Sequence, residues 1–247
     1  MIASKEHSCD RLFRCWLFLV IAFGLCLRLV YFSEDIGGSH TFRQAMVANQ
    51  IDSLKRGPYP GPRLGFLERY DQVYDYGVRF YDTPVYQYLD AVLSDVLEID
   101  AVKAGRLVNL LCYAGISLVF YLLLVEIGLG PPVALLTILL FAISPLSIQN
   151  FIGVYPDTLA SLAAILSFFL LLRYERRRSW PNFVVALFLG FVCVLIKSSI
   201  YLIFFAAYVW NLAWTERARI FRRLDLVFFG FVMACSVMVF VLERSYF

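Results

Sequence analysis

Several ionisable residues lie beside long apolar stretches of this sequence, where an unpaired charge is costly. Arg28, Arg106, Asp157 and Lys197 each stand at or near the end of such a stretch. Ionisable residues at the edge of a membrane layer are rare and often functional. A basic side chain there either extends its charged head into the interface, as an anchor, or holds an anion such as the phosphate of a lipid. These residues therefore suit the handling of a charged group next to lipid.

A second group of polar residues follows the first apolar stretch. His40 can accept a proton or bind a metal ion near neutral pH, and it can equally cap the helix that follows it. Asp82, which precedes Thr83-Pro84, and Asp157, which follows Pro156, lie at expected helix starts, where an aspartate cap contributes about 1 kcal/mol. Each of these residues therefore has both a chemical and a structural interpretation. The other polar residues of this group are Glu34, Asp35, Arg43 and Gln44.

The composition is that of a membrane protein. Hydrophobic residues make up 61% of the 247 residues and charged residues only 17%, whereas a soluble domain carries about 25% charged residues. The net charge of +3 is too small to favour a nucleic-acid partner. The six cysteines form no CxxC pair, so we expect small buried side chains rather than disulfides or zinc ligands.

Apolar runs of about 20 residues predict transmembrane helices. Seven runs occur, at 12–32, 104–125, 133–151, 158–172, 183–196, 200–214 and 226–242. The fifth and sixth are short and flank Lys197, so they form either two tight spans or one broken pair. The first is longer than the apolar core of a signal peptide and is expected to remain as an anchor. We therefore expect an all-α polytopic membrane protein, with residues 1–247 as a single transmembrane domain.

Basic loops predict the orientation, because they mark the cytoplasmic side of a membrane. Three basic segments occur: the N-terminus and the segments after the fourth and sixth runs. Seven spans place all three on one side, which predicts a cytoplasmic N-terminus. The ionisable residues at the helix ends then fall on the outer side. The basic residues are Lys5, Arg11, Arg14, Arg173, Arg176, Arg177, Arg178, Arg217, Arg219, Arg222 and Arg223.

The long loop at 33–103 falls on the same outer side and holds 11 of the 19 Asp and Glu residues. Loops of this length are usually functional or structured. Helical spacing predicts two amphipathic helices on the membrane surface, at 41–56 and 84–97. The aromatic stretch between them is either an interfacial belt or a platform for a sugar. The residues that show this spacing are Phe42, Ala45, Met46 and Asn49 in the first helix and Val85, Tyr88, Leu89, Val92 and Val96 in the second.

A series of short motifs, in a fixed order, resembles one family. The motifs are Ser39-His-Thr-Phe-Arg-Gln-Ala45, Asp82-Thr-Pro-Val-Tyr-Gln-Tyr-Leu89, Gly105-Arg-Leu-Val-Asn109, Phe141-Ala-Ile-Ser-Pro-Leu146, Tyr155-Pro-Asp157 and Leu195-Ile-Lys-Ser198. Their order is similar to that of the GT-C-type membrane glycosyltransferases (family 39) related to the protein O-mannosyltransferases and the aminoarabinose transferases of lipid A. The bacterial version with a His-x-Trp-Arg-Gln motif is most similar, although Phe42 replaces its Trp here.

The resemblance implies the N-terminal part of a GT-C fold and an inverting transfer of a sugar from a polyprenyl-phosphate donor. The acceptor would be a lipid, a glycan or a protein at the periplasmic face of the inner membrane. The reaction needs a base for the acceptor and positive charge or a divalent metal ion for the leaving phosphate. The base stays open among His40, Asp35 and Asp82. The implied substrate-binding residues are Arg43, Gln44, Tyr86, Asp157 and Lys197.

Length separates this chain from its expected relatives, which have around a dozen spans. The resemblance therefore predicts the front part of a longer transferase, a truncated reading frame or a degenerate relative. Two other functions remain as alternatives. A transporter or flippase would carry helix breaks at mid-membrane depth, and the break near Lys197 is the feature in its favour. A non-catalytic membrane subunit would fit the short length and the substitution of Met46 for an acidic residue.

Overall fold

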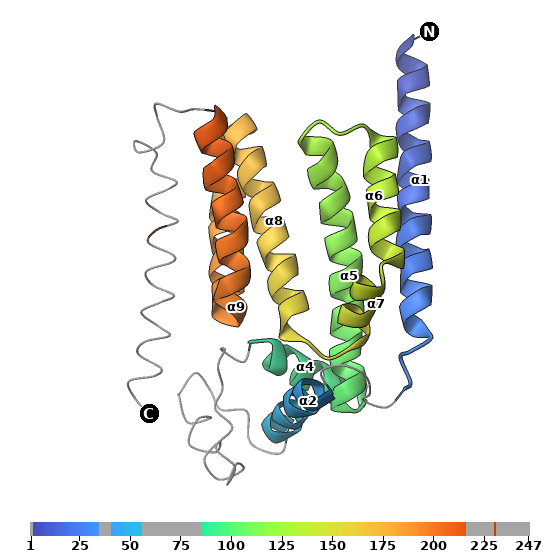
Figure 1. Ribbon diagram of the computed structural model, residues 1–247, viewed down its shortest axis with the longest axis vertical. Coiled ribbons are helices and arrows are strands. Elements are labelled where there is room, and N and C mark those ends of the chain that lie inside the picture. Colours follow the sequence, from blue (N-terminus) through green and yellow to red (C-terminus); the bar gives the residue numbers. More distant parts are fainter. Residues whose placement is uncertain (1, 35–40, 56–84, 216–229, 231–247) are drawn as a thin grey trace.

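The computed structural model describes residues 2–34, 41–55, 85–215 and 230 (Figure 1). Every regular element in these ranges is an α-helix, which confirms the predicted fold class. The helices are α1 (Ile2–Leu29), α2 (Thr41–Lys55), α4 (Val85–Leu97), α5 (Ala101–Glu126), α6 (Pro131–Ile143), α7 (Pro145–Ile152), α8 (Pro156–Arg177) and α9 (Trp180–Thr215).

Four stretches among the described residues are long and apolar enough to cross a membrane: Leu12–Leu29, Ala101–Glu126, Pro156–Arg177 and Trp180–Lys197. The bent pair α6–α7 would make a fifth. The predicted run at 200–214 corresponds to the second half of α9, where Ser199–Tyr208 forms a shorter apolar helix. The predicted run at 226–242 lies outside the described residues, except for residue 230.

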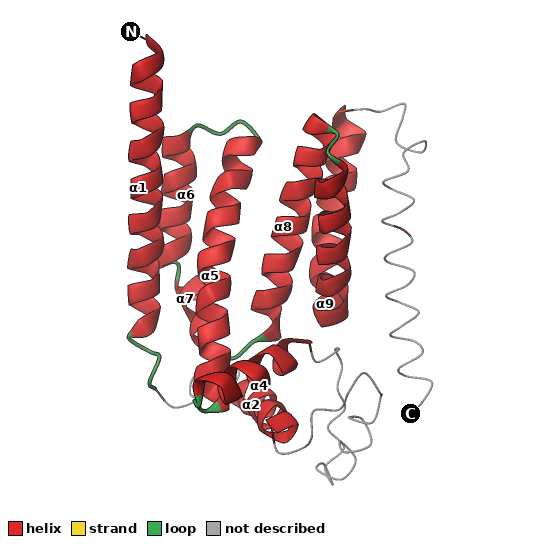
Figure 2. Ribbon diagram, turned by 180° about the vertical axis from the view of Figure 1, so that it is seen from behind, coloured by secondary structure: helices red, strands yellow, loops and turns green. Residues whose placement is uncertain are grey.

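The long helices stand side by side, and α2 and α4 lie across one end of the bundle (Figures 1 and 2). α1 ends at this end, and α5 and α8 begin there. The start of α1, the turn between α5 and α6, and the end of α8 lie at the opposite end. We call the end that carries α2 and α4 the capped end. The predicted basic segment after α8 therefore lies at the other end from Asp157, which begins α8.

The predicted helix at 133–151 is not one straight helix, because the structure breaks it into α6 and α7, which meet at 61°. Ser144, between them, has a φ of −60° and a ψ of 126°, outside the helical region. Pro145 explains the break, since its ring excludes the helical conformation at the preceding residue and it has no N–H to donate. The apolar run was visible in the sequence, and Pro145 was the signal of its bend.

Arg28 joins α1 to this bend. Its side chain is 1% exposed; Nη1 donates to the carbonyls of Gly24 at 2.7 Å and Ala142 at 3.2 Å, and Nη2 donates to Ser147 Oγ at 2.7 Å. The guanidinium also lies 3.7 Å from the ring centroid of Tyr113. Ala142 belongs to the last turn of α6, whose carbonyls lack helical partners. Arg28 therefore clamps the bend inside the protein and is not an interfacial anchor.

α1 and α5 approach each other closely at Gly24. A Cβ at residue 24 would lie 1.8 Å from the Tyr113 hydroxyl. Tyr113 is fully buried between Arg28 and Phe141, so its ring has no room to move. We expect Gly24→Val to lower the free energy of unfolding by about 3 kcal/mol, because overpacking a close contact costs this order of energy.

Denaturant unfolding of the purified protein in detergent micelles measures this effect. Gly130→Ala is the control, because a Cβ at residue 130 meets no atom closer than 3.8 Å. An unfolding midpoint for Gly24→Val equal to that of the wild type would show that α1 and α5 do not meet here.

Both predicted surface helices exist, as α2 and α4. In α4, Leu89, Val92 and Val96 are exposed, and in α2 Asn49 is exposed while Ala45 and Met46 are half-buried. A membrane protein can turn an apolar stripe towards lipid and bury small and polar side chains between helices. The period of each helix was therefore predictable, but not its inward side. The buried side chains are Gln44, Val47, Ala48, Gln50 and Ile51 in α2 and Tyr86, Gln87, Asp90, Ala91 and Ser94 in α4.

α9 reverses direction at Lys197, whose φ of −159° and ψ of 91° interrupt the helix. Its two halves lie side by side (Figures 1 and 2), and Tyr201 of the second half packs against Gly190 of the first. The apolar runs on either side of Lys197 are thus a tight hairpin. Its tip lies at the capped end, where Lys197 reaches Asp157 at the start of α8, and not halfway along the bundle.

Candidate active site at the capped end

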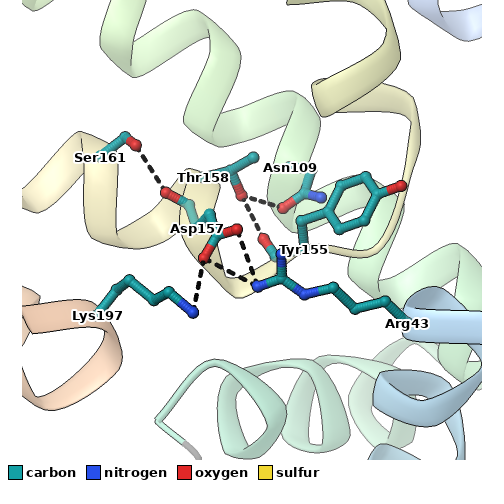
Figure 3. Close-up of polar contacts among 7 residues, drawn as sticks. All are labelled: Arg43, Asn109, Tyr155, Asp157, Thr158, Ser161 and Lys197. Atoms are coloured by element: carbon teal, nitrogen blue, oxygen red, sulfur yellow. Dashed lines mark hydrogen bonds and ion pairs between the residues drawn. The ribbon is translucent and has the colours of Figure 1, made fainter. Parts of the chain in front are cut away.

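Two cations from distant parts of the chain meet one carboxylate at the capped end (Figure 3). Arg43 Nη2 of α2 lies 3.1 Å from Asp157 Oδ1 and 2.9 Å from Oδ2. Lys197 Nζ, from the tip of the α9 hairpin, lies 3.7 Å from Asp157 Oδ1. The three side chains are 36%, 29% and 33% exposed in the order Arg43, Lys197, Asp157. We call these three side chains the cation cluster; each of them is partly exposed at the capped end.

The first turn of α8 fixes the position of Asp157. Pro156 occupies the start of this helix, where its missing N–H costs nothing and its fixed φ suits the helix. Asp157 follows in the first turn, where the positive end of the helix dipole favours a carboxylate. Ser161 Oγ donates to the Asp157 carbonyl at 2.7 Å. The carboxylate side chain is used for the ion pairs, so it does not act as the predicted side-chain cap.

Asn109 of α5 ties this turn to the rest of the bundle. It is fully buried, and its Nδ2 donates to the carbonyl of Gly153 at 2.5 Å. Its Oδ1 accepts from the hydroxyl of Thr158 and from the hydroxyl of Tyr86, the latter at 3.2 Å. Asn109 thereby links α4, α5, the α7–α8 connection and α8. Since Thr158 directly follows Asp157, this network sets where the carboxylate points.

A second contact ties α2 to the same connection. Gln44 Nε2 donates to the Tyr155 hydroxyl at 2.9 Å, and the Arg43 guanidinium lies 5.9 Å from the centroid of the Tyr155 ring. Burial raises the pKa of Tyr155, and the Gln44 contact opposes part of the shift. Tyr155 therefore stays a neutral hydroxyl near pH 7. It supports the side of the helix that presents Arg43.

Only some of the catalytic and substrate-binding residues predicted from the sequence lie together in the structure. Arg43, Asp157 and Lys197 come together, and Gln44 supports them from within the protein, being only 5% exposed. Tyr86 is fully buried, and its hydroxyl contacts the Gly105 carbonyl and Asn109. The three candidate bases, His40, Asp35 and Asp82, lie outside the described residues.

Two polar residues of the site had no role assigned from the sequence. Asn109 is an uncharged amide within an apolar run, and Thr158 follows the nominated Asp157. A lone buried amide in a transmembrane helix signals a hydrogen-bond partner on another helix, and that signal could have identified Asn109. Among the described residues, no group of three His, Cys, Asp or Glu side chains is placed to hold a metal ion.

Comparison with known proteins identifies the family. Residues 82–242, well over half of the 247, match the family described as dolichyl-phosphate-mannose-protein mannosyltransferase. The matched segment begins before α4 and includes Asn109, Asp157 and Lys197. No curated protein and no solved structure gave a match. The chain therefore belongs to the dolichyl-phosphate-mannose-protein mannosyltransferase family of GT-C-type membrane glycosyltransferases.

Proposed function

We propose that this protein transfers a sugar from a polyprenyl-phosphate donor to an acceptor at the outer face of the inner membrane. The cation cluster is the observation that carries the proposal. Arg43 and Lys197 reach one point from α2 and from the α9 hairpin, and that point lies where the apolar helices end. A phosphate attached to a lipid chain has its charge at this depth. Two cations there would hold the phosphate while the chain remains in the membrane.

The position of the basic residues supports placing the cation cluster at the outer face of the membrane. Arg176 and Arg177, in the last turn of α8, lie at the end of the bundle opposite Asp157. Basic residues mark the cytoplasmic side, so the capped end faces outward. The helices α2 and α4, which lie between α1 and α5 in the sequence, belong to this end as well. Lipid, glycan and protein acceptors all fit this arrangement.

The proposed reaction is a displacement at the anomeric carbon. The acceptor oxygen forms a bond to this carbon, and the bond from the carbon to the phosphate oxygen breaks. The electron pair of that bond leaves with the phosphate, where Arg43 and Lys197 offset the added negative charge. The acceptor proton goes to a base, for which His40, Asp35 and Asp82 are the candidates. Asp157 holds the two cations in place, while Gln44 and Tyr86 act through their protein contacts.

Sugar transfer in proteoliposomes tests this function. We expect wild-type protein to transfer label from a radiolabelled polyprenyl-phosphate sugar to added membrane acceptors. Lys197→Gln should lower the rate by about tenfold, because it removes one of two charges that stabilise the leaving phosphate. The effect is moderate since the ammonium group stays partly hydrated.

Lys103→Gln is the matched control. Lys103 also lies at the capped end, and its ammonium pairs with Asp100 at 2.9 Å, away from Asp157. We expect this variant to keep the wild-type rate. Equal rates for the Lys197 and Lys103 variants would remove Lys197 from the phosphate site. Absence of transfer by the wild type, with every acceptor class supplied, would overturn the proposed function.

A further inference from the structure

Asp90 is a buried carboxyl group that the proposed reaction does not use. Its side chain is 0% exposed on the inner face of α4, and within the described part of the chain neither oxygen makes a hydrogen bond of normal geometry, although the Tyr86 hydroxyl lies near it. Oδ2 lies against α5 at Gly105, where a Cβ would be 3.2 Å from it. A charged carboxylate would pay a large desolvation cost there. The packing of α4 on α5 therefore favours a neutral, protonated Asp90.

No cation pairs with Asp90 within the described part of the chain. The titratable groups that interact with it are Tyr86 of its own helix and the Cys112 thiol of α5. Arg106, which follows Gly105 on α5, donates instead to the carbonyls of Phe32 and Glu34, in the turn after α1. Lys197, from α9, is paired with Asp157. The charge of an ionised Asp90 would thus have no ion-pair partner among the described residues.

Asp90 lies beside the contacts that join α4 to the cation cluster. Tyr86, one turn earlier, hydrogen-bonds to Asn109, which holds the first turn of α8. Gln87 Nε2 donates to Gln50 Oε1 of α2 at 2.8 Å, so α4 also carries the helix that bears Arg43. The hydrogen bonds that connect α4 to α2 and to α8 are therefore made by uncharged side chains. If α4 moved away from α5, both α2, which bears Arg43, and the start of α8, which bears Asp157, would therefore lose contacts that position them.

The linkage between proton binding and docking predicts how the stability of α4 docking on α5 changes with pH. Burial raises the pKa of Asp90 to about 8, with the nearby Tyr86 hydroxyl opposing part of the shift. An aspartate on a displaced, hydrated α4 has a pKa of about 3.9. At a pH between these two pKa values, Asp90 is protonated when α4 is docked and ionised when α4 is displaced. The stability of docking therefore falls as the pH rises from about 4 to about 8, and it levels off above that.

We propose that Asp90 is a positioning residue: the layer formed by α2 and α4 docks on α5 with uptake of one proton at Asp90, and the geometry of the cation cluster follows this equilibrium. The proton comes from water and returns to it when the layer lifts. Docking itself does not depend on sugar transfer. Only its consequence for the donor phosphate rests on the proposed function.

Amide hydrogen exchange of the full chain in nanodiscs tests the proton uptake. We expect the protection of residues 85–97, corrected for intrinsic exchange, to fall by about tenfold for each pH unit between about pH 5 and about pH 7. Asp90→Asn keeps the shape of the neutral acid and cannot ionise, so its protection should stay constant with pH. Asp95→Asn, which changes an exposed aspartate of the same helix, should behave like the wild type. An Asp90→Asn variant with the wild-type slope would overturn the proposal.

Infrared spectroscopy gives a second readout that does not require the variant to match the wild-type stability. The wild type should show the C=O stretch of a protonated carboxylic acid at about pH 7, where a hydrated aspartate is ionised. This band should disappear with a midpoint near the pKa of about 8. Asp95→Asn should retain the band, and Asp90→Asn should lack it. A wild-type spectrum without the band at about pH 7 would show that Asp90 is ionised in the docked protein and would refute the proposal, whether or not sugar transfer is found.

Discussion

In the Asp157→Asn variant, we expect polyprenyl phosphate to bind about tenfold more tightly while sugar transfer falls by about a hundredfold. Asparagine has nearly the shape of aspartate but lacks its charge, so the cation cluster gains one unit of positive charge. A phosphate then meets Arg43 and Lys197 without the negative charge of Asp157 beside them. The transfer rate falls because Asp157 fixes where both cations lie, and catalysis depends on that position more than on affinity. Equilibrium binding of a fluorescent polyprenyl phosphate and the transfer assay measure the two effects separately.

Glu126→Gln is the matched control for this variant. Glu126 also forms a carboxylate ion pair, at 3.0 Å from Arg176, but at the opposite end of the bundle. Neither binding nor transfer should change in this control. Weaker phosphate binding by Asp157→Asn would contradict our assignment, since it would mean that the carboxylate favours the ligand, as it would through a bound divalent ion.

Asn109→Ala should lower the free energy of unfolding by about 3 kcal/mol. The change removes three hydrogen bonds and leaves the Gly153 carbonyl and the hydroxyls of Tyr86 and Thr158 without this partner in a buried site. One hydrogen bond between transmembrane helices averages about 0.6 kcal/mol, and each buried polar group left unpaired adds about 1 kcal/mol or more. Denaturant unfolding in detergent micelles measures the loss.

An exposed amide provides the control for Asn109. Asn150 of α7 is exposed, and Asn150→Ala should leave the unfolding midpoint within about 0.5 kcal/mol of the wild type. In the Asn109→Ala variant, amide hydrogen exchange should also become faster in α4 and in the first turn of α8, because Asn109 joins these two segments. A stable Asn109→Ala protein with unchanged exchange in both segments would contradict the linking role of this residue.

The bend between α6 and α7 shows how far apolar length alone can predict structure. The run at 133–151 was correctly recognised as apolar, but hydropathy averages over the one residue pair that breaks it. Pro145 acts on the backbone of Ser144 locally, so a closer look at this dipeptide would have predicted the break. The 61° angle and the clamp by Arg28 depend on where α1 lies. No local pattern contains that information.

For the surface helices α2 and α4, too, the sequence pattern predicts some features and tertiary packing decides others. Their existence and bounds followed from helical spacing and from flanking glycine and proline residues. Their inward faces did not, because a helix at a membrane surface has two apolar environments, lipid and protein interior. In α4 the exposed Val92 and Val96 are more apolar than the buried Asp90. Only the packing against α5 decides which side is buried.

The sequence by itself determined the membrane class, the helical architecture and the gathering of polar residues at one end of the bundle. These properties follow from local hydropathy, which acts over about 20 residues at a time. The tertiary structure alone decided that Arg43 pairs with Asp157 across 114 residues of sequence, that Lys197 joins them, and that Asn109 holds them in register. Such pairings depend on how whole helices pack, because a charge near lipid is stable only beside the partner that packing delivers to it.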